Sequence, residues 1–242
     1  MKKKIIMYSA LSLAFLIIFI IMCILIKNSG GDPLSIDAKI RDFFYEIRGN
    51  KNGFNYYLSN IVTYLGDTIA VFLVGFIILI FTKGDNKVFS FFLGVVITLC
   101  LNVVIKEIFQ RDRPFAEYFW AHENDASFPS GHSVAAAYIY TFSIYLIIKS
   151  KFNKILKTIL SITCGLLIVV VVVSRLTLGV HYFSDVIAGL SLGFTMVFLS
   201  ILFEEFLIQF GIFEKPILVS IHDAIKSRKN KKEEKQIENK EE

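Results

Sequence analysis

Long apolar runs alternate with short polar segments along this chain of 242 residues. A helix needs about 20 residues to cross a hydrocarbon core of roughly 30 Å. Runs close to this length or longer predict six spans, at residues 5–26, 60–82, 88–105, 133–148, 155–173 and 186–207. The pattern therefore predicts an all-α protein, a six-span transmembrane helical bundle.

The first apolar run follows three lysines, an arrangement also found in cleaved signal peptides. The run is longer than the usual core of a signal peptide, and no small-x-small cleavage site follows it. We therefore interpret residues 5–26 as a retained first span.

Residues 28–57 are a polar connection between the first two spans, with one helical stretch inside it. Apolar residues recur there at positions that share one helical face, namely Ile36, Ile40, Phe43, Phe44 and Ile47. The Asp32-Pro33 pair favours a helix start, and Gly49 favours a stop. We predict an extracytoplasmic amphipathic helix on the membrane surface or packed on the bundle, either as a simple connector or as a guide for lipid.

The composition is typical of a membrane protein, but by itself it indicates no particular reaction or ligand. The chain is 55% hydrophobic with a mean hydropathy of +0.60, above the roughly 45–50% of soluble domains. We expect one membrane domain at residues 1–218 and a charged cytoplasmic tail at residues 219–242. Cys23, Cys100 and Cys164 lie far apart inside apolar runs, which predicts neither a disulfide framework nor a metal site. We expect no metal or other cofactor.

The distribution of positive charge predicts the orientation in the membrane. If the six spans alternate, lysines at positions 2–4, 83, 87 and 149–154 and the basic part of the tail share one side. The positive-inside rule makes that side cytoplasmic, with both termini. Four cations within residues 28–57 weaken the bias. We expect a multi-pass protein of the cell membrane whose net charge of +5 reflects topology, with no nucleic acid as partner.

Three cations stand at the edges of apolar runs on the predicted outer side: Lys106, Arg113 and Arg175. Each of them alone is typical of an interfacial anchor whose charged end reaches water. Three cations held together near a low-dielectric boundary suit a dianionic phosphate, to which arginine offers forked donors. Their predicted convergence favours a phosphate site.

The tetrapeptide Pro129-Ser130-Gly131-His132 directly precedes the fourth apolar run, so we expect His132 in the first helical turn. Backbone N–H groups at a helix start suit phosphate oxygens, and the Ser130 hydroxyl adds a donor. His132 can give a proton to a departing oxygen. The alternative is a simple helix cap followed by an interfacial histidine.

His181 and Asp185 are four residues apart, so they share one face if the segment is helical. The carboxylate can then accept one imidazole N–H and leave the other ring nitrogen as a nucleophile. The alternative is a capping aspartate beside a surface histidine. An ionisable group at the edge of a span favours the functional interpretation.

The patterns Lys-x6-Arg-Pro, Pro-Ser-Gly-His and Ser-Arg-x5-His-x3-Asp stand in this order in the chain. They resemble the three signature motifs of the type 2 phosphatidic acid phosphatase family of membrane lipid phosphatases. The superfamily also includes soluble bacterial acid phosphatases and vanadium haloperoxidases. The resemblance covers about residues 60–207, and it implies metal-independent hydrolysis of a lipid phosphate.

The resemblance also implies a role for each matching residue. Phosphate would be bound by Lys106, Arg113 and Arg175, together with Ser130 and the backbone of Gly131. His181 would attack phosphorus and form a phosphohistidine, with Asp185 orienting the ring. His132 would protonate the leaving lipid oxygen and then assist water.

Two substrate classes fit these motifs, because the motifs specify the phosphate and not the lipid tail. An outward-facing site favours undecaprenyl diphosphate, and the alternative is phosphatidic acid or phosphatidylglycerophosphate. A protein of another class, which binds or transports a lipid phosphate without hydrolysis, is a further alternative, whereas a vanadate-dependent peroxidase is disfavoured in a chain built to meet lipid. The expected partners are a phosphorylated membrane lipid and the bilayer, and the sequence leaves the oligomeric state open.

Overall fold

The computed structural model describes residues 2–51, 53–82, 86–115, 119–121 and 123–210. These residues form helices connected by loops, with no strand among them, so the all-α prediction is confirmed. The elements are α1 Lys2–Asn28, α2 Ser35–Ile47, α3 Phe54–Thr63, the short 3-10 helix η1 Tyr64–Gly66, α4 Thr68–Thr82, α5 Asn86–Phe109, α6 Gly131–Lys149, α7 Lys154–Thr177 and α8 Phe183–Gln209.

Five of the described helices, α1, α5, α6, α7 and α8, are long and apolar enough to cross a membrane. A sixth span arises if α3 and α4 are counted as one, although they are bent by 52° at a short break. The predicted second span at residues 60–82 is therefore not one continuous helix. The chain is extended at Asp67, where φ is −87° and ψ is 168°. An ionisable side chain is costly in hydrocarbon, and the break lies where Asp67 interrupts the apolar run.

Gly66 explains how close the bent segment comes to the rest of the bundle. A Cβ atom at this position would lie 2.6 Å from Val171 Cγ1 and 3.1 Å from the carbonyl oxygen of His132. Only a glycine permits this approach. The bend between α3 and α4 thus packs directly against the start of α6.

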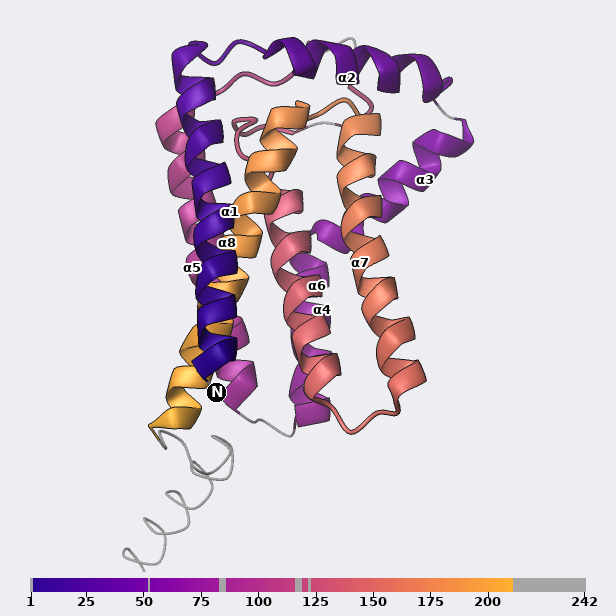
Figure 1. The fold of residues 1–242 in the computed structure, drawn as a ribbon. Helices are drawn as coiled ribbons and strands as arrows, with labels where there is room; N and C mark the ends of the chain where they lie inside the picture. The colour runs from indigo at the N-terminus through magenta and orange to yellow at the C-terminus, as the bar shows by residue number, and fades with distance from the viewer. Residues whose placement is uncertain (1, 52, 83–85, 116–118, 122, 211–242) are drawn as a thin grey trace, which may run out of the picture.

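Helix α8 runs through the bundle and packs against α1, α5 and α6 (Figure 1). Two glycines of α8 allow a close approach to α6: a Cβ at Gly189 would lie 2.5 Å from the Ser130 carbonyl oxygen, and one at Gly193 would lie 2.5 Å from that of Val134. Small residues at such crossings let membrane helices pack backbone to backbone. This packing places the start of α6 beside the start of α8.

Helix α2 lies across one end of the bundle, above the loops that carry the three motifs (Figure 1). It begins at Ser35, three residues after the predicted Asp32-Pro33 start, and ends before Gly49, whose φ is +79°. Ile36, Phe43 and Ile47 on its apolar face are exposed, as expected for a helix at a membrane surface.

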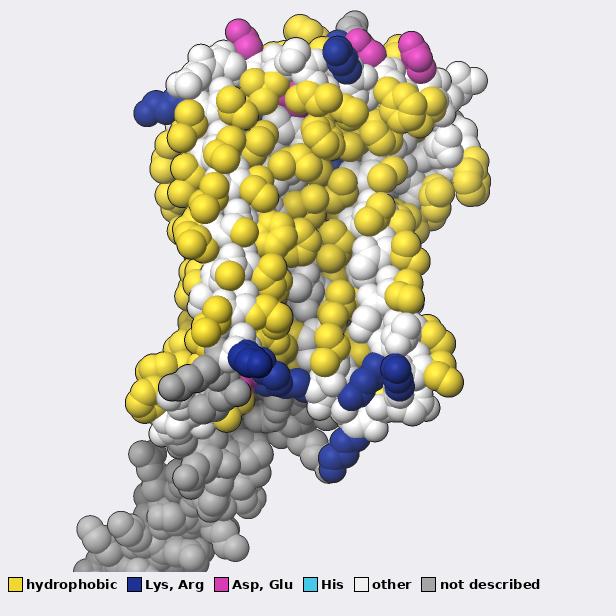
Figure 2. Space-filling view, viewed as in Figure 1, with side chains coloured by type: hydrophobic (Ala, Val, Ile, Leu, Met, Phe, Trp, Pro, Cys, Tyr) yellow, Lys and Arg dark blue, Asp and Glu magenta, His cyan; other side chains and the backbone are white. Residues whose placement is uncertain are grey.

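The face of the bundle drawn in Figure 2 is apolar along most of its length. On α7, for example, Ile159, Ile162 and Leu166 are more than half exposed. Large exposed apolar surfaces of this kind are stable in contact with lipid. Figure 2 also shows Lys and Arg side chains gathered at the end opposite α2. The protein is therefore a multi-pass membrane protein.

Three parts of the sequence-based predictions lie outside the described residues: Lys83, residues 211–218 of the predicted membrane domain, and the predicted tail at residues 219–242.

Candidate active site

The three predicted phosphate-binding cations converge at the end of the bundle that α2 covers. Lys106 lies near the end of α5, Arg113 in the loop that follows, and Arg175 near the end of α7. Their side chains are only 8%, 8% and 2% exposed. The structure thus brings together three cations that are up to 69 positions apart in the sequence.

Two carboxylates of the loop between α5 and α6 pair with these cations. Asp125 Oδ2 lies 2.9 Å from Lys106 Nζ, and Asp125 also forms an ion pair with Arg113. Glu123 pairs with Arg175, and its other oxygen lies 4.0 Å from Arg113 Nη2. Burial alone would raise the pKa of Asp125, but Lys106 and Arg113 lower it to about 2. The three cations therefore already bind anionic oxygen atoms, which are supplied by the protein itself.

His181 lies in the turn between α7 and α8, where its side chain is 2% exposed. Burial lowers the pKa of His181 well below the usual value of 6.5, and the nearby charges of Arg113, Arg175, Lys106 and His132 lower it further. The ring is consequently neutral at pH 7. A neutral imidazole has one unprotonated nitrogen that can act as a nucleophile.

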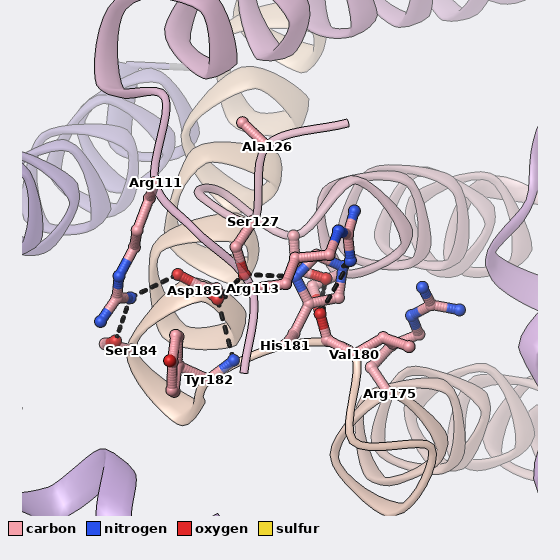
Figure 3. Close-up of polar contacts among 12 residues, drawn as sticks. Arg111, Arg113, Ala126, Ser127, Arg175, Val180, His181, Tyr182, Ser184 and Asp185 are labelled. Atoms are coloured by element: carbon pink, nitrogen blue, oxygen red, sulfur yellow. Dashed lines mark hydrogen bonds and ion pairs between the residues drawn. The ribbon is translucent and has the colours of Figure 1, made fainter. Parts of the chain in front are cut away.

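The contacts of His181 indicate which nitrogen that is. Arg113 Nη1 lies 3.3 Å from Nε2 of His181, and a guanidinium can only donate hydrogen bonds. Nε2 is therefore the acceptor, and the ring proton is on Nδ1. Nδ1 faces Ser127 Oγ at 3.5 Å and Asp185 Oδ2 at 3.7 Å (Figure 3). The lone pair of Nε2 therefore points toward Arg113.

Asp185 lies in the first turn of α8 with its carboxylate fully buried. Its Oδ2 accepts hydrogen bonds from the Ser127 hydroxyl at 2.5 Å and from the Tyr182 N–H at 2.8 Å, and its Oδ1 accepts one from Arg111 at 2.5 Å (Figure 3). His181 precedes α8, so the two residues do not share one helix, although they still approach each other with His181 Nδ1 3.7 Å from Asp185 Oδ2. That separation exceeds a hydrogen bond. Ser127, in contact with both groups, links them.

The Pro-Ser-Gly-His tetrapeptide forms the start of α6, with Ser130 at the N-cap and His132 as the second helical residue. The Ser130 N–H donates to the Asp185 carbonyl oxygen at 3.1 Å, which ties this helix start to α8. The Ser130 hydroxyl is fully buried and accepts a hydrogen bond from Ser133 at 3.0 Å. It can still donate its own hydrogen to a ligand. His132 lies near enough to His181 for its charge to affect that ring.

Five polar residues around the site were missed by the sequence reasoning: Asp37, Arg111, Glu123, Asp125 and Ser127. Four of them stand in the loop between Lys106 and Ser130, among several other charged residues with no periodic pattern. The remaining one, Asp37, belongs to α2 and carries no local signal of a distant partner. Among the residues that the structure describes, no group of three or more His, Cys, Asp or Glu side chains is arranged to hold a metal ion.

The fold and the site define a multi-pass helical membrane protein with a neutral, buried histidine beside a cluster of cations. The family model of the PAP2 superfamily matches residues 87–208, half of the chain, and the chain belongs to this family. The resemblance inferred from the three motifs is thereby confirmed.

Known relatives agree with this assignment. The chain is 43% identical over 107 residues to phosphatidylglycerophosphatase B of Bacillus subtilis (strain 168), an alignment that covers 43% of this chain and 52% of the relative. The chain thus matches about half the length of this curated relative. A crystal structure described as the first transmembrane PAP2 type phosphatidylglycerolphosphate phosphatase, from Bacillus subtilis, superposes with a TM-score of 0.68 at 27% identity, covering 81% of this chain and 96% of the other.

The crystal structure of Aquifex aeolicus LpxE is also similar, with a TM-score of 0.54 at 23% identity over 66% of this chain and 93% of that one. At this level of identity the similarity shows the fold alone. Two solved structures thus share the helical arrangement described above.

Proposed function

We propose that this protein is a lipid phosphatase that hydrolyses the phosphate monoester of a glycerophospholipid, with phosphatidylglycerophosphate as the favoured substrate. The observation that carries the proposal is the 3.3 Å contact between Arg113 and the unprotonated Nε2 of a neutral His181, beside Lys106 and Arg175. A nucleophile and a phosphate-binding cluster then share one position. The names of the relatives support the glycerolipid substrate, so undecaprenyl diphosphate, which the sequence placed first, becomes the second candidate.

Binding begins when the phosphate replaces Glu123 and Asp125 as the partner of the three cations. Arg113 and Arg175 offer forked N–H donors, and Lys106 offers a compact charge. The start of α6 adds the Ser130 hydroxyl and backbone N–H groups. These donors also stabilise the negative charge on the phosphoryl oxygens as the reaction proceeds.

In the first chemical step, Nε2 of His181 forms a bond to phosphorus and the bond from phosphorus to the lipid oxygen breaks. The electron pair of that bond stays on the lipid oxygen, which takes a proton from His132. The phosphorylated ring of His181 carries a positive charge. The Nδ1–H then faces Ser127 and the anionic Asp185, which stabilise it.

In the second step, His132 accepts a proton from water while the water oxygen attacks the phosphohistidine. The bond between phosphorus and Nε2 breaks, and inorganic phosphate leaves. His181 returns to its neutral form with the proton on Nδ1. His132 keeps the proton it needs for the next turnover.

The decisive experiment measures phosphate release by the full chain in detergent micelles. The lipids are phosphatidylglycerophosphate, phosphatidic acid and undecaprenyl diphosphate at matched mole fractions. We expect the highest kcat/KM for phosphatidylglycerophosphate and loss of at least about a thousandfold in His181→Ala, since the nucleophile is removed. A preference for undecaprenyl diphosphate would reverse the order of substrates. A parent protein that binds these lipids but releases no phosphate would instead support the non-hydrolytic class.

The site is proposed to face the outside of the cell, because lysines gather at the other end of the bundle. A membrane-impermeant maleimide applied to intact cells tests this orientation. In a variant without the three native cysteines, Asp112→Cys should be labelled and Lys151→Cys should be labelled only after lysis. The opposite result would place the site in the cytoplasm.

A further inference from the structure

Asp37 of α2 and Arg111 of the loop after α5 form a buried ionic network with Asp185. All three side chains have an exposure of 0%. Arg111 Nη1 donates to Asp185 Oδ1 at 2.5 Å, and its Nη2 donates to Asp37 Oδ2 at 3.0 Å. One guanidinium therefore bridges the carboxylate beside the nucleophile and a carboxylate from the helix that covers the end of the bundle.

Further contacts hold Arg111 in one orientation. Its Nε donates to the carbonyl oxygen of Gly31 at 3.0 Å. Its Nη1 also donates to Ser184 Oγ at 2.7 Å (Figure 3). The guanidinium carbon lies 4.4 Å from the centre of the Tyr182 ring. A side chain held by this many directed contacts presents its donors to Asp185 at a fixed position.

Asp37 fixes the first turn of α8, which carries Asp185. Its Oδ1 accepts the Ser184 N–H at 2.7 Å, and its Oδ2 accepts the Ser184 hydroxyl at 2.6 Å. Ser184 and Asp185 are adjacent, so a shift of Asp37 would move the carboxylate that faces His181. The helix across the end of the bundle is thereby connected to the ring of the nucleophile.

A purely structural role explains this network poorly. A buried group of charges is weak evidence for stability, because the cost of removing the charges from water can exceed their attraction. Two carboxylates that share one guanidinium leave a net negative charge beside the imidazole. That charge favours the Nδ1–H tautomer and the cationic ring that forms when Nε2 attacks phosphorus.

We propose that Asp37 and Arg111 are positioning residues for the nucleophile, acting through Asp185 to orient and stabilise the His181 ring. The proposal rests on the hydrolytic function proposed above. Asp37 keeps Arg111 shared between two carboxylates, so that Asp185 remains a strong acceptor toward the Ser127 hydroxyl, whose oxygen faces the Nδ1–H of His181. Without the charge of Asp37, Arg111 would pair with Asp185 alone and weaken that acceptor.

The kinetic test compares Asp37→Asn and Arg111→Lys with the parent and with Asp42→Asn, an exposed acid on the same helix. Hydrolysis of phosphatidylglycerophosphate is measured in detergent, and active sites are counted by bound orthovanadate. We expect kcat per site to fall about tenfold in Asp37→Asn, because the variant loses a charged hydrogen-bond partner of Arg111. KM and vanadate affinity should change less than about twofold, because the cations that bind phosphate are untouched. Asp42→Asn should match the parent. In Arg111→Lys, kcat should also fall, because one ammonium cannot bridge both carboxylates with the same geometry.

A second measurement reports on the ring without requiring turnover. Nitrogen-15 NMR of labelled histidine, with the His181 signals assigned by their absence in His181→Ala, shows which ring nitrogen carries the proton. We expect the Nδ1–H form in the parent and a changed signal in both network variants. A parent that releases no phosphate but shows this response would refute the hydrolytic function and leave the positioning role supported.

The positioning role is overturned if kcat per site and the His181 signals of Asp37→Asn both equal those of the parent. If Asp37→Asn does not fold, the same two readouts on Arg111→Lys decide. If kcat per site and the His181 signals of Arg111→Lys also equal those of the parent, the network serves only to anchor α2.

Discussion

Replacing Asp125 with asparagine should tighten the binding of orthovanadate and inorganic phosphate. The Asp125 carboxylate pairs with Lys106 at 2.9 Å and with Arg113, two of the three cations proposed to bind the phosphate. An incoming phosphate must displace this carboxylate before it can use the same donors. The variant Asp125→Asn removes that competition while it preserves the shape of the side chain.

The size of the effect follows from the electrostatics of Asp125. Although burial alone would raise its pKa, Lys106 and Arg113 lower the value from 3.8 to about 2. This difference of about 1.8 pKa units corresponds to at most roughly 2.5 kcal/mol. The side chain is 56% exposed, so solvent screening reduces the interaction to about 1 kcal/mol. Since 1.4 kcal/mol is about a factor of ten, the variant should bind the anion about fivefold more tightly.

The assay is the inhibition constant of orthovanadate, measured with the parent and the variant at one pH and one ionic strength. The matched control is Asp112→Asn, which removes the same charge from an exposed position in the same loop and should change the constant much less. Weaker vanadate binding in Asp125→Asn would refute the reasoning. The carboxylate would then hold the cations in place for the phosphate instead of competing with it.

Three further predictions concern the proposed nucleophile His181 and the helix packing around it. Ser127→Ala removes the 2.5 Å hydrogen bond to Asp185, so kcat should fall about tenfold at an unchanged KM; a rise in KM alone would assign Ser127 to substrate binding. Gly189→Ala places a Cβ 2.5 Å from the Ser130 carbonyl oxygen and should destabilise the protein by about 1–3 kcal/mol in thermal unfolding. Gly165→Ala, whose Cβ would meet no atom within 4 Å, is its control. Finally, the pKa of His181 is near 6.5 in the unfolded chain and well below that value in the folded chain. The free energy of unfolding should therefore decline as pH falls below 6.5, because only the unfolded chain takes up the proton. The decline should be less steep in His181→Asn, which lacks this group.

Apolar run length determined much of the fold without any tertiary information. Hydrocarbon thickness sets the length of a span, so the runs that became α1, α5, α6, α7 and α8 could be predicted from hydropathy. The amphipathic α2 also followed from periodicity. The bend between α3 and α4 was not predicted, because one aspartate in an apolar run does not by itself show that the helix breaks there. The close approach of Gly66 to Val171 and His132 is visible only in the folded structure.

The sequence also placed the chemistry at one end of the bundle. Lys106, Arg113, Arg175, His132 and His181 stand at span edges, and alternating spans bring those edges to one side. The sequence therefore predicted which residues gather at this end of the bundle, although not how they contact one another.

Only the tertiary structure decided how these residues contact one another. Asp185 does not bond His181 along one helix; it is held by Ser127 and Arg111, and Asp37 reaches Ser184 across 147 positions. Hydropathy and periodicity describe each segment alone, whereas a buried polar group finds its partner through the packing of separate helices. For this reason the proposed nucleophile His181 and its proposed partner Asp185 could be named from the sequence, whereas Ser127, Arg111 and Asp37 could not.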